Sequence, residues 1–226
     1  MSEHTFANPA ALDASLADDI VHRLATALDA RGRAYLVVSG GSTPKGLFTA
    51  LAASDLAWSQ VTVLLADERW VPHDHIDCNE RMVREHLLTG KARDAQLLSL
   101  IEGYPDTAAN LAWVNQQLAD IGAFDVVILG MGLDGHTASL FPDAPELIEG
   151  LDTIEPALMT SPQVAPHGRI SLSRKRILDT RLGVIHIVGQ DKLAVLSNAV
   201  ASDDCEAYPI VNFLNCSNPF TVYFAP

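Results

Sequence analysis

Four continuous apolar runs of strand length constrain the fold of this chain more than any other feature. The runs are AYLVVS (34–39), VTVLLA (61–66), DVVILG (125–130) and GVIHIVG (183–189). Strands that are buried on both faces of a parallel sheet have this pattern, whereas half-exposed strands alternate between apolar and polar residues. The four runs therefore predict the central strands of a parallel sheet.

Helical stretches separate these runs. From Leu12 to Leu28 an aliphatic residue recurs at every fourth position, which predicts an amphipathic helix over 10–31 that Gly32 ends. Four further helices are expected, over 44–53, 79–88, 107–121 and 191–200. This alternation is typical of an α/β, Rossmann-like fold, in which a doubly wound, mostly parallel sheet carries helices on both faces. The ligand site of such a fold lies at the carboxyl ends of the strands.

Two weaker strand candidates follow a more alternating pattern. They are RISLS (169–173) and FTVYFA (220–225), and both are expected toward an edge of the sheet. Frequent prolines between Pro142 and Gly168 predict an irregular excursion over the surface, which could help to cover the site.

The composition bounds the number of domains and the class of partner. With 226 residues, 48% of them hydrophobic, the chain is expected to form a single domain over 1–226. Its formal net charge of −13 opposes binding to nucleic acid or to an anionic membrane. A small anionic substrate stays compatible with this charge, because a few cations in one pocket set the local potential. A monomer and a small homo-oligomer are both compatible with the sequence.

The cysteines and the N-terminal segment indicate the compartment. Cys78, Cys205 and Cys216 have neither CxxC nor zinc-ribbon spacing, so neither a disulfide framework nor a structural zinc site is expected. The first residues lack a basic segment followed by an apolar one, and no run of about 18 apolar residues occurs. We therefore expect a cytoplasmic protein without a targeting or anchoring segment.

The first apolar run leads directly into a glycine-containing loop, SGGSTPKG (39–46). Its glycines allow close backbone approach, and the amides of a helix N-terminus together with the hydroxyls of Ser42 and Thr43 suit a phosphate. A strand-to-helix turn with a Ser/Thr cap explains the loop equally well. The loop matches neither GxGxxG nor the Walker A pattern, so no nucleotide cofactor is indicated.

Charged residues follow the second run, in ADERWVP (66–72). Asp67, Glu68 and Arg69 would lie at the same rim of the sheet, either as site residues or as an ordinary solvated turn. The next segment, HDHIDCNER (73–81), contains His73, His75 and Asp77, a pattern that can bind metal. Because the sequence shows no matching distant ligand, we expect a polar loop and no metal site, with Asn79 as a candidate helix cap.

The loop after the third run has the strongest catalytic pattern. In GMGLDGHTASLFP (130–142) three glycines surround Asp134 and His136, so an acid and an imidazole are presented together beside free backbone amides. Histidine is the side chain whose ordinary pKa lies nearest neutrality. His136 is therefore a candidate general base that Asp134 orients, although a lone histidine is more often structural.

Taken together, SGGSTP, ADERWVP with NERM, GMGLDGHTASLFP, RISLS and the closing TVYFAP resemble the 6-phosphogluconolactonase family, in order and over nearly the whole chain. The resemblance implies the α/β fold of the sugar-phosphate isomerases and deaminases. It also implies hydrolysis of the carboxylic ester of 6-phosphogluconolactone to give 6-phosphogluconate in the oxidative pentose phosphate pathway, without a required cofactor.

The resemblance also implies roles for individual residues. His136 is the base, with Asp134 beside it, and the substrate phosphate meets Gly41, Ser42 and Thr43. Arg69, Arg169 and Lys192 fall at the family's substrate-binding cations, while Asp67 and Gly132 are further site candidates. Arg174, Lys175 and Arg176 are expected to form a solvated helix start, and the role of Arg81 stays open. An oxyanion at the lactone carbonyl would be stabilised either by amides near Gly132 or by Arg69.

One departure separates the lactonases from the related glucosamine-6-phosphate deaminases. The deaminases continue from this histidine into an asparagine–glutamate–proline sequence whose glutamate takes part in acid–base work, whereas Thr137 to Pro142 here contain no carboxylate. Lactone hydrolysis is therefore favoured, and a deaminase or sugar-phosphate isomerase is the alternative. A sugar-phosphate sensor without catalytic activity is disfavoured, because no DNA-binding segment or basic patch is present.

Overall fold

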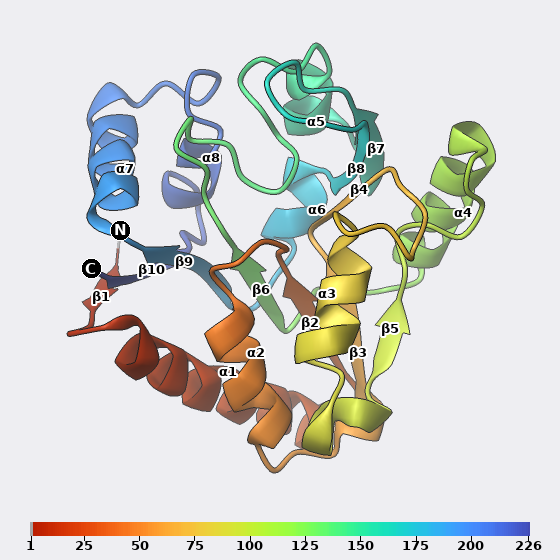
Figure 1. Cartoon of the computed structure of the whole chain (residues 1–226), viewed down its shortest axis with the longest axis vertical. Coiled ribbons are helices and arrows are strands. Elements are labelled where there is room, and N and C mark those ends of the chain that lie inside the picture. Colours follow the sequence, from red (N-terminus) through yellow and green to blue (C-terminus); the bar gives the residue numbers. More distant parts are fainter. Residues whose placement is uncertain (1) are drawn as a thin grey trace.

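A seven-stranded, entirely parallel sheet forms the centre of the computed structural model, which describes residues 2–226 (Figure 1). In spatial order its strands are β1 (Glu3–Thr5), β10 (Thr221–Ala225), β9 (Gly183–Val188), β6 (Val126–Leu129), β2 (Ala34–Val38), β3 (Val61–Leu65) and β5 (Gln96–Leu98). The four predicted central strands are β2, β3, β6 and β9. They lie next to one another in the sheet, with β10 and β1 on one side of them and β5 on the other. The apolar runs therefore correctly marked the buried part of the sheet.

The helices connect these strands in two directions. From β1 to β5 the chain moves toward one edge through α1 (Pro9–Arg31), α2 (Lys45–Ala53) and α3 (Asn79–His86), which pack side by side (Figure 1). It then returns toward the other edge through α4 (Thr107–Ala119), α6 (Arg174–Leu178) and α7 (Gln190–Ser202). Right-handed crossovers therefore place the two groups on opposite faces, which is the doubly wound arrangement that the sequence predicted.

Helix termini follow their local sequence in most places. Asn8 caps α1 by accepting from the amide of Ala11, and Gly32 ends the helix in the left-handed region with φ of 68°. At α3, however, Cys78 occupies the N-cap position. The prediction of Asn79 as the cap was wrong, because its side chain is buried and donates to the carbonyl of Asp67 at 3.0 Å.

A second, antiparallel sheet stands beyond the central one. It consists of β4 (Asp67–Arg69), β8 (Arg169–Leu172) and β7 (Ala157–Thr160), with β8 in the middle. The chain enters it directly from β3, and the carbonyl of Ala66 between the two strands accepts from the amide of Leu172 at 2.9 Å. This small sheet carries side chains of β4 and β8 to the carboxyl end of the large one.

The second sheet corrects two expectations. The segment 169–173 is not at the edge of the main sheet but forms the buried central strand of the small one, whereas 220–225 does lie one strand from an edge. The excursion from Pro142 to Gly168 is not irregular throughout, since it contains α5 (Leu147–Asp152) and β7. Both errors arise because strand pairing across a long loop is invisible in a local pattern.

The charge run at the start of α6 is only partly solvated. Arg176 is buried, with its guanidinium 3.6 Å from the centre of the Phe124 ring and hydrogen-bonded to the carbonyls of Ile121 and Gly122. The expectation of a solvated helix start was therefore wrong for this residue. Three further short elements lie in the connections: α8 (Val211–Leu214) and the 3₁₀ turns over Trp58–Gln60 and Gly90–Asp94. Within residues 2–226, no helix combines the length and the apolar character that crossing a membrane requires.

Candidate active site

A cavity of about 270 Å³ opens at the carboxyl ends of the central strands. Segments far apart in the chain form its wall: the loop from β2 to α2, the second sheet, the loop after β6, and the start of α7. Nine of the site residues predicted from the sequence line it, namely Gly41, Ser42, Thr43, Asp67, Arg69, Gly132, His136, Arg169 and Lys192. The structure thus brings the separate motifs of the sequence to one place, as expected for this class of fold.

The loop before α2 presents its backbone to the cavity. Gly41 has φ of 91°, a conformation that favours glycine, and a Cβ at Gly40 would lie 1.9 Å from the side-chain oxygen of Asn79. Pro44 occupies the N-cap position of α2, and no side chain caps the helix there. The Ser/Thr cap that was one interpretation of this loop is therefore not formed, and a helix N-terminus without a side-chain cap stays compatible with a bound anion.

The three charged residues of β4 alternate between the cavity and the protein interior. Asp67 and Arg69 line the cavity, while the buried Glu68 points away from it. The Glu68 carboxylate accepts from the amides of Arg69, Asn79 and Glu80 at 2.7, 2.8 and 2.6 Å, and so holds the first turn of α3 against β4. Burial raises the pKa of Glu68, and these hydrogen bonds oppose the increase. Glu68 therefore holds β4 and the start of α3 in position and does not face the cavity.

Asp67 is held by partners from two other segments. Its Oδ2 accepts from the hydroxyl of Ser139 at 2.6 Å and lies 3.7 Å from Nη1 of Arg169. Ser139 is itself fully buried, and its amide donates to the hydroxyl oxygen of Ser171 on β8 at 3.1 Å. This network fixes the position of the Arg169 guanidinium, which also lies 5.1 Å from the centre of the Phe141 ring.

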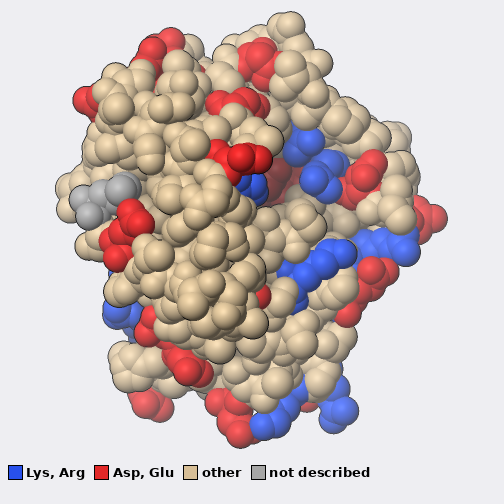
Figure 2. Space-filling model, turned by 60° about the vertical axis from the view of Figure 1, so that its left-hand side comes forward, with Lys and Arg blue, Asp and Glu red and all other residues tan. Residues whose placement is uncertain are grey.

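Three cations make the cavity positive although the chain as a whole is strongly acidic. Arg69, Arg169 and Lys192 line it, and burial lowers the pKa of both Arg169 and Lys192 because it penalises the charged form. Figure 2 shows Lys and Arg side chains in and beside a hollow on one face, with Asp and Glu at its rim and scattered over the rest of that face. Partly desolvated cations of this kind attract an anion strongly.

The loop after β6 holds His136 against Asp134. The Nδ1 atom of His136 lies 2.5 Å from Oδ1 of Asp134, whose carboxylate also accepts from the His136 amide at 3.2 Å. The imidazole stacks on the Phe141 ring with the ring centres 3.8 Å apart. Burial would raise the pKa of Asp134, but the hydrogen bonds and charge of His136 outweigh it, so that this pKa lies below its ordinary value. An ionised Asp134 thus orients the ring from outside the cavity wall.

Gly132 is required by this arrangement. A Cβ there would lie 2.2 Å from Nδ1 of His136 and 2.5 Å from Oδ1 of Asp134, closer than real Cβ contacts. The Gly132 amide donates to the carbonyl of His136 at 3.0 Å, so the loop closes on itself. Gly132 therefore shapes the loop, and its amide is already occupied.

The sequence profile of a family described as glucosamine-6-phosphate isomerases/6-phosphogluconolactonase matches residues 7–221. The chain belongs to this family. Most of the cavity wall comes from segments that carried the resemblance in the sequence, namely SGGSTP, ADERWVP, GMGLDGHTASLFP and RISLS.

Two relatives that match nearly the whole chain are named 6-phosphogluconolactonase. The protein of that name from Rhizobium meliloti is 42% identical over 227 residues, which cover 99% of this chain and 98% of the relative. The one from Pseudomonas putida is 40% identical over 226 residues, which cover 99% of this chain and 92% of the relative.

Solved structures share the fold over the full length. The crystal structure of a 6-phosphogluconolactonase from Shewanella baltica is 43% identical and has a TM-score of 0.97, covering 100% of this chain and 98% of that one. A monomeric glucosamine-6-phosphate deaminase has a TM-score of 0.84 at 15% identity, a likeness that shows the common fold alone.

Some residues of the cavity were not anticipated from the family motifs. His186 on β9 lines it, is 2% exposed, and has Nε2 3.3 Å from Oδ1 of Asp13, while neither ring nitrogen makes a hydrogen bond. Asn79 at the start of α3 also lines the cavity. The sequence offered one indication of His186, a histidine inside the otherwise apolar strand GVIHIV. Such a residue is interpreted as part of the core unless the strand is known to lie beside the site.

Other candidates lie elsewhere. Arg81 pairs with Glu85 on the exposed side of α3, with Nε 2.8 Å from Oε1, and does not line the cavity. The excursion over 142–168 does not line it either, so the expected cover over the site is not formed by that segment. His73 turns its Nε2 to the carbonyl of Ile101 at 3.0 Å, whereas His75 and Asp77 meet a distant residue, His167.

Proposed function

We propose that this protein hydrolyses 6-phosphogluconolactone to 6-phosphogluconate, in the oxidative pentose phosphate pathway. One observation carries the proposal: His136, which Asp134 holds from outside the cavity wall, shares a cavity with three cations and the backbone of an anion-binding loop. The phosphate of an anionic sugar lactone suits the cations and the loop amides, and its ester carbonyl suits the histidine. The names of the full-length relatives support the same reaction.

The phosphate would bind at the end of the cavity formed by α2 and α7. The amides of Gly41, Ser42 and Thr43 precede the uncapped N-terminus of α2, and Lys192 stands in the first turn of α7. Arg169 completes this group of donors. Binding at the unreactive phosphate would hold the lactone carbonyl near His136 and so contribute to orientation.

His136 would act as a general base on water. With Nδ1–H donating to the Asp134 carboxylate, the lone pair of Nε2 is free to accept a proton as the water oxygen attacks C1 of the lactone. The C1 carbonyl becomes a tetrahedral oxyanion. When the bond between C1 and the ring oxygen breaks, the imidazolium returns the proton to that oxygen, which leaves a carboxylic acid and a hydroxyl group.

Arg69 is the better placed of the two groups proposed to stabilise the oxyanion. The Gly132 amide is already bonded to the His136 carbonyl, whereas Arg69 uses Nη1 for the carbonyl of Asp77 at 2.7 Å and has a buried Nε without a partner. A guanidinium at this position can donate to an oxyanion without first giving up a hydrogen bond.

In the described part of the chain, the cavity lacks the free carboxylate that deamination or isomerisation would use. Among the described residues that line the cavity, Asp67 is the one acid, and it is held by Ser139 and Arg169. Transfer of protons between carbon atoms requires a base at the substrate carbons. Lactone hydrolysis, which proceeds with one base and one cation, therefore fits this cavity better.

The decisive experiment follows freshly generated 6-phosphogluconolactone against its spontaneous opening. We expect the purified protein to accelerate ring opening and to release neither ammonia nor fructose-6-phosphate from glucosamine-6-phosphate. Turnover of glucosamine-6-phosphate with no effect on the lactone would overturn the proposal in favour of the deaminase alternative.

The cysteines support a cytoplasmic setting. Cys78, Cys205 and Cys216 are all free thiols, and Cys205 is exposed, as is usual in a reducing compartment. We place the activity in the cytoplasm on this ground.

A further inference from the structure

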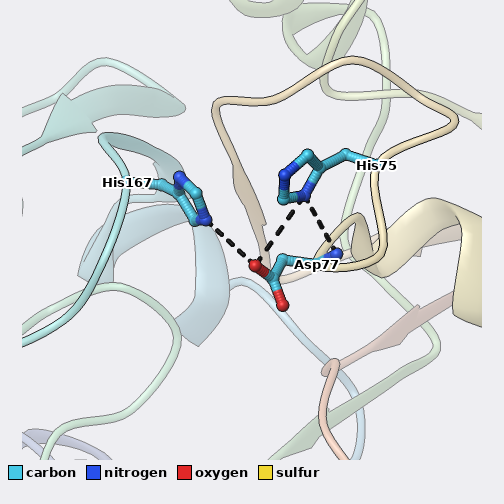
Figure 3. A group of neighbouring side chains, drawn as sticks. All are labelled: His75, Asp77 and His167. Atoms are coloured by element: carbon cyan, nitrogen blue, oxygen red, sulfur yellow. Dashed lines mark hydrogen bonds and ion pairs between the residues drawn. The ribbon is translucent and has the colours of Figure 1, made fainter.

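Two loops meet beside the second sheet at a cluster of two histidines and an aspartate. His75 and Asp77 lie between β4 and α3, and His167 lies 90 residues further along, just before β8. In Figure 3 both imidazole rings turn toward the carboxylate of Asp77, each from its own loop. None of the three residues lines the catalytic cavity, and the lactone chemistry proposed above does not use them.

The distances within the cluster approach those of a metal site. Oδ2 of Asp77 lies 3.0 Å from Nε2 of His167 and 3.7 Å from Nδ1 of His75, and one ligand atom from each residue lies within 4.8 Å of the others. Zinc binds imidazole nitrogen and carboxylate oxygen at about 2.0–2.2 Å, which in a tetrahedral site separates two ligands by about 3.3 Å. The two distances to Asp77 lie on either side of this value, and a turn of the half-buried His75 side chain would bring its imidazole closer to that of His167.

The backbone at His167 supports a role beyond a chance contact. His167 has φ of 70°, in the left-handed region that costs a residue with a Cβ conformational energy. Such strain is retained where the surrounding structure needs the side chain at that place. Here it directs the imidazole to Asp77, and the adjacent Gly168 carbonyl accepts from the amide of Trp70 at 2.7 Å, which ties the loop to β4.

We propose that His75, Asp77 and His167 form a binding site for a divalent metal ion of the zinc class, separate from the catalytic cavity. Two imidazoles and one carboxylate are a ligand set that suits zinc and neighbouring transition metals, and the half-exposed cluster leaves a fourth position for water. Binding replaces the hydrogen bond that Nδ1 of His75 accepts from the Asp77 amide at 3.1 Å.

The site stands next to the catalytic cavity without entering it. The carbonyl of Asp77 accepts from Nη1 of Arg69, so a bound ion would hold Asp77 and, through it, the orientation of a cavity cation. The ion would also join the loop after β4 to the loop before β8. It would be a clamp between two loops, in contrast to a catalytic zinc that touches substrate.

Metal content tests this proposal directly. The protein is stripped with EDTA, dialysed, and titrated with Zn²⁺ alone by calorimetry, and the bound metal is then counted by elemental analysis. We expect one Zn²⁺ per chain and no comparable binding of Mg²⁺, which prefers oxygen ligands. His167→Gln and His75→Gln should each lower the affinity by more than the ~10–100-fold that loss of an outer-sphere partner typically costs.

Two variants control for other sites. His73→Gln removes a histidine from the same loop that does not join the cluster, and His136→Asn removes the one beside Asp134. Both should bind Zn²⁺ as the parent does. The proposal is overturned if the parent binds no stoichiometric Zn²⁺, if both His75→Gln and His167→Gln bind it with parental affinity, or if His136→Asn abolishes binding. Should His167→Gln fail to fold, His75→Gln decides.

Discussion

His136 lies on a loop, but contacts on several sides hold its imidazole ring in place. Its ring is stacked on Phe141, paired with Asp134 and closely approached by Gly132, so it has one orientation relative to the cavity. A general base needs such an orientation because proton transfer requires the acceptor within hydrogen-bond reach of the attacking water. Most of the chemistry proposed for this protein therefore depends on a single side chain and its support.

Replacing this base should remove most of the rate. For His136→Asn we expect turnover to fall by about 10²- to 10⁴-fold, the range that general-base catalysis typically contributes. The circular dichroism spectrum and melting temperature should stay close to those of the parent. A folded variant that keeps more than about a third of the parental turnover would contradict this assignment, because that is far outside the expected range.

The Asp134 carboxylate should make stability depend on pH. Its pKa in the folded protein lies below the ordinary value of 3.8, since the interactions with His136 outweigh the opposing effect of burial. A group with a depressed folded pKa stabilises the protein above its unfolded pKa, and this contribution is lost as the pH falls through the folded value. Denaturant unfolding at several pH values should therefore show Asp134→Asn destabilised at pH 5 and the difference from the parent reduced near pH 3. An equal difference at both values would show that the carboxylate acts only through packing.

The phosphate contacts should be separable from the reacting end. Removing a hydrogen bond to a charged group costs roughly 1.5–3 kcal/mol, so Arg169→Ala and Lys192→Ala should each raise KM for the phosphorylated lactone by about 10- to 150-fold. On unphosphorylated gluconolactone the same variants should differ little from the parent, since the contact does not exist there. Equal impairment on both substrates would place these residues at the reacting carbon or in the fold.

Among the elements, β4 links the sheet to the site over only three residues. It continues β3 into the second sheet, directs Asp67 and Arg69 into the cavity, and anchors α3 through Glu68. A short strand at a sheet end acquires this role because alternate side chains point to opposite faces. The fixed geometry of the cavity wall thus depends on a residue that does not touch it.

Loss of the Glu68 carboxylate should destabilise the protein. Glu68→Ala leaves the buried amides of Asn79 and Glu80 without an acceptor, which should lower the free energy of unfolding by at least about 1–3 kcal/mol. Glu85→Ala, on the exposed side of the same helix, is the matched control and should change it little. Denaturant titration of both variants measures the difference, and equal stabilities would show that Glu68 does not anchor α3.

At the scale of the whole molecule, the two proposed sites lie on either side of Arg69. The cavity holds the proposed base and the cations, while the His75, Asp77 and His167 cluster lies outside it and is connected to it by a hydrogen bond from Arg69 to the carbonyl of Asp77. A strongly acidic chain can still bind an anionic substrate because the cations are concentrated at one end of the sheet.

This separation predicts the response to metal removal. Because the groups proposed to carry out hydrolysis contain no ligand of the cluster, the EDTA-treated enzyme should keep most of its lactonase activity. The assay compares treated, untreated and Zn²⁺-restored protein on the same lactone preparation. Complete loss of activity that a divalent ion restores would instead make His75, Asp77 and His167 part of the catalytic machinery.

The sequence alone determined the central sheet, the long helices and most of the cavity wall. The apolar runs of β2, β3, β6 and β9 reveal burial on both faces, and helical periodicity and Gly32 define α1, because these signals are local. The loops that follow those strands necessarily gather at one end of a parallel sheet. Hence the meeting of Arg69 and His136 in one cavity was predictable from the strand pattern, whereas Lys192 was predicted from the family resemblance.

Only the tertiary structure decided the contacts between distant segments. The pairing of β4 with β8, the burial of Arg176 on Phe124 and the place of His186 beside the site all join residues that no local pattern relates. The same holds for His167, the distant partner whose absence from the sequence pattern had argued against metal binding near His75. Burial and coordination depend on which segments the fold brings into contact, and closing a loop of about ninety residues leaves no periodic signal in the chain.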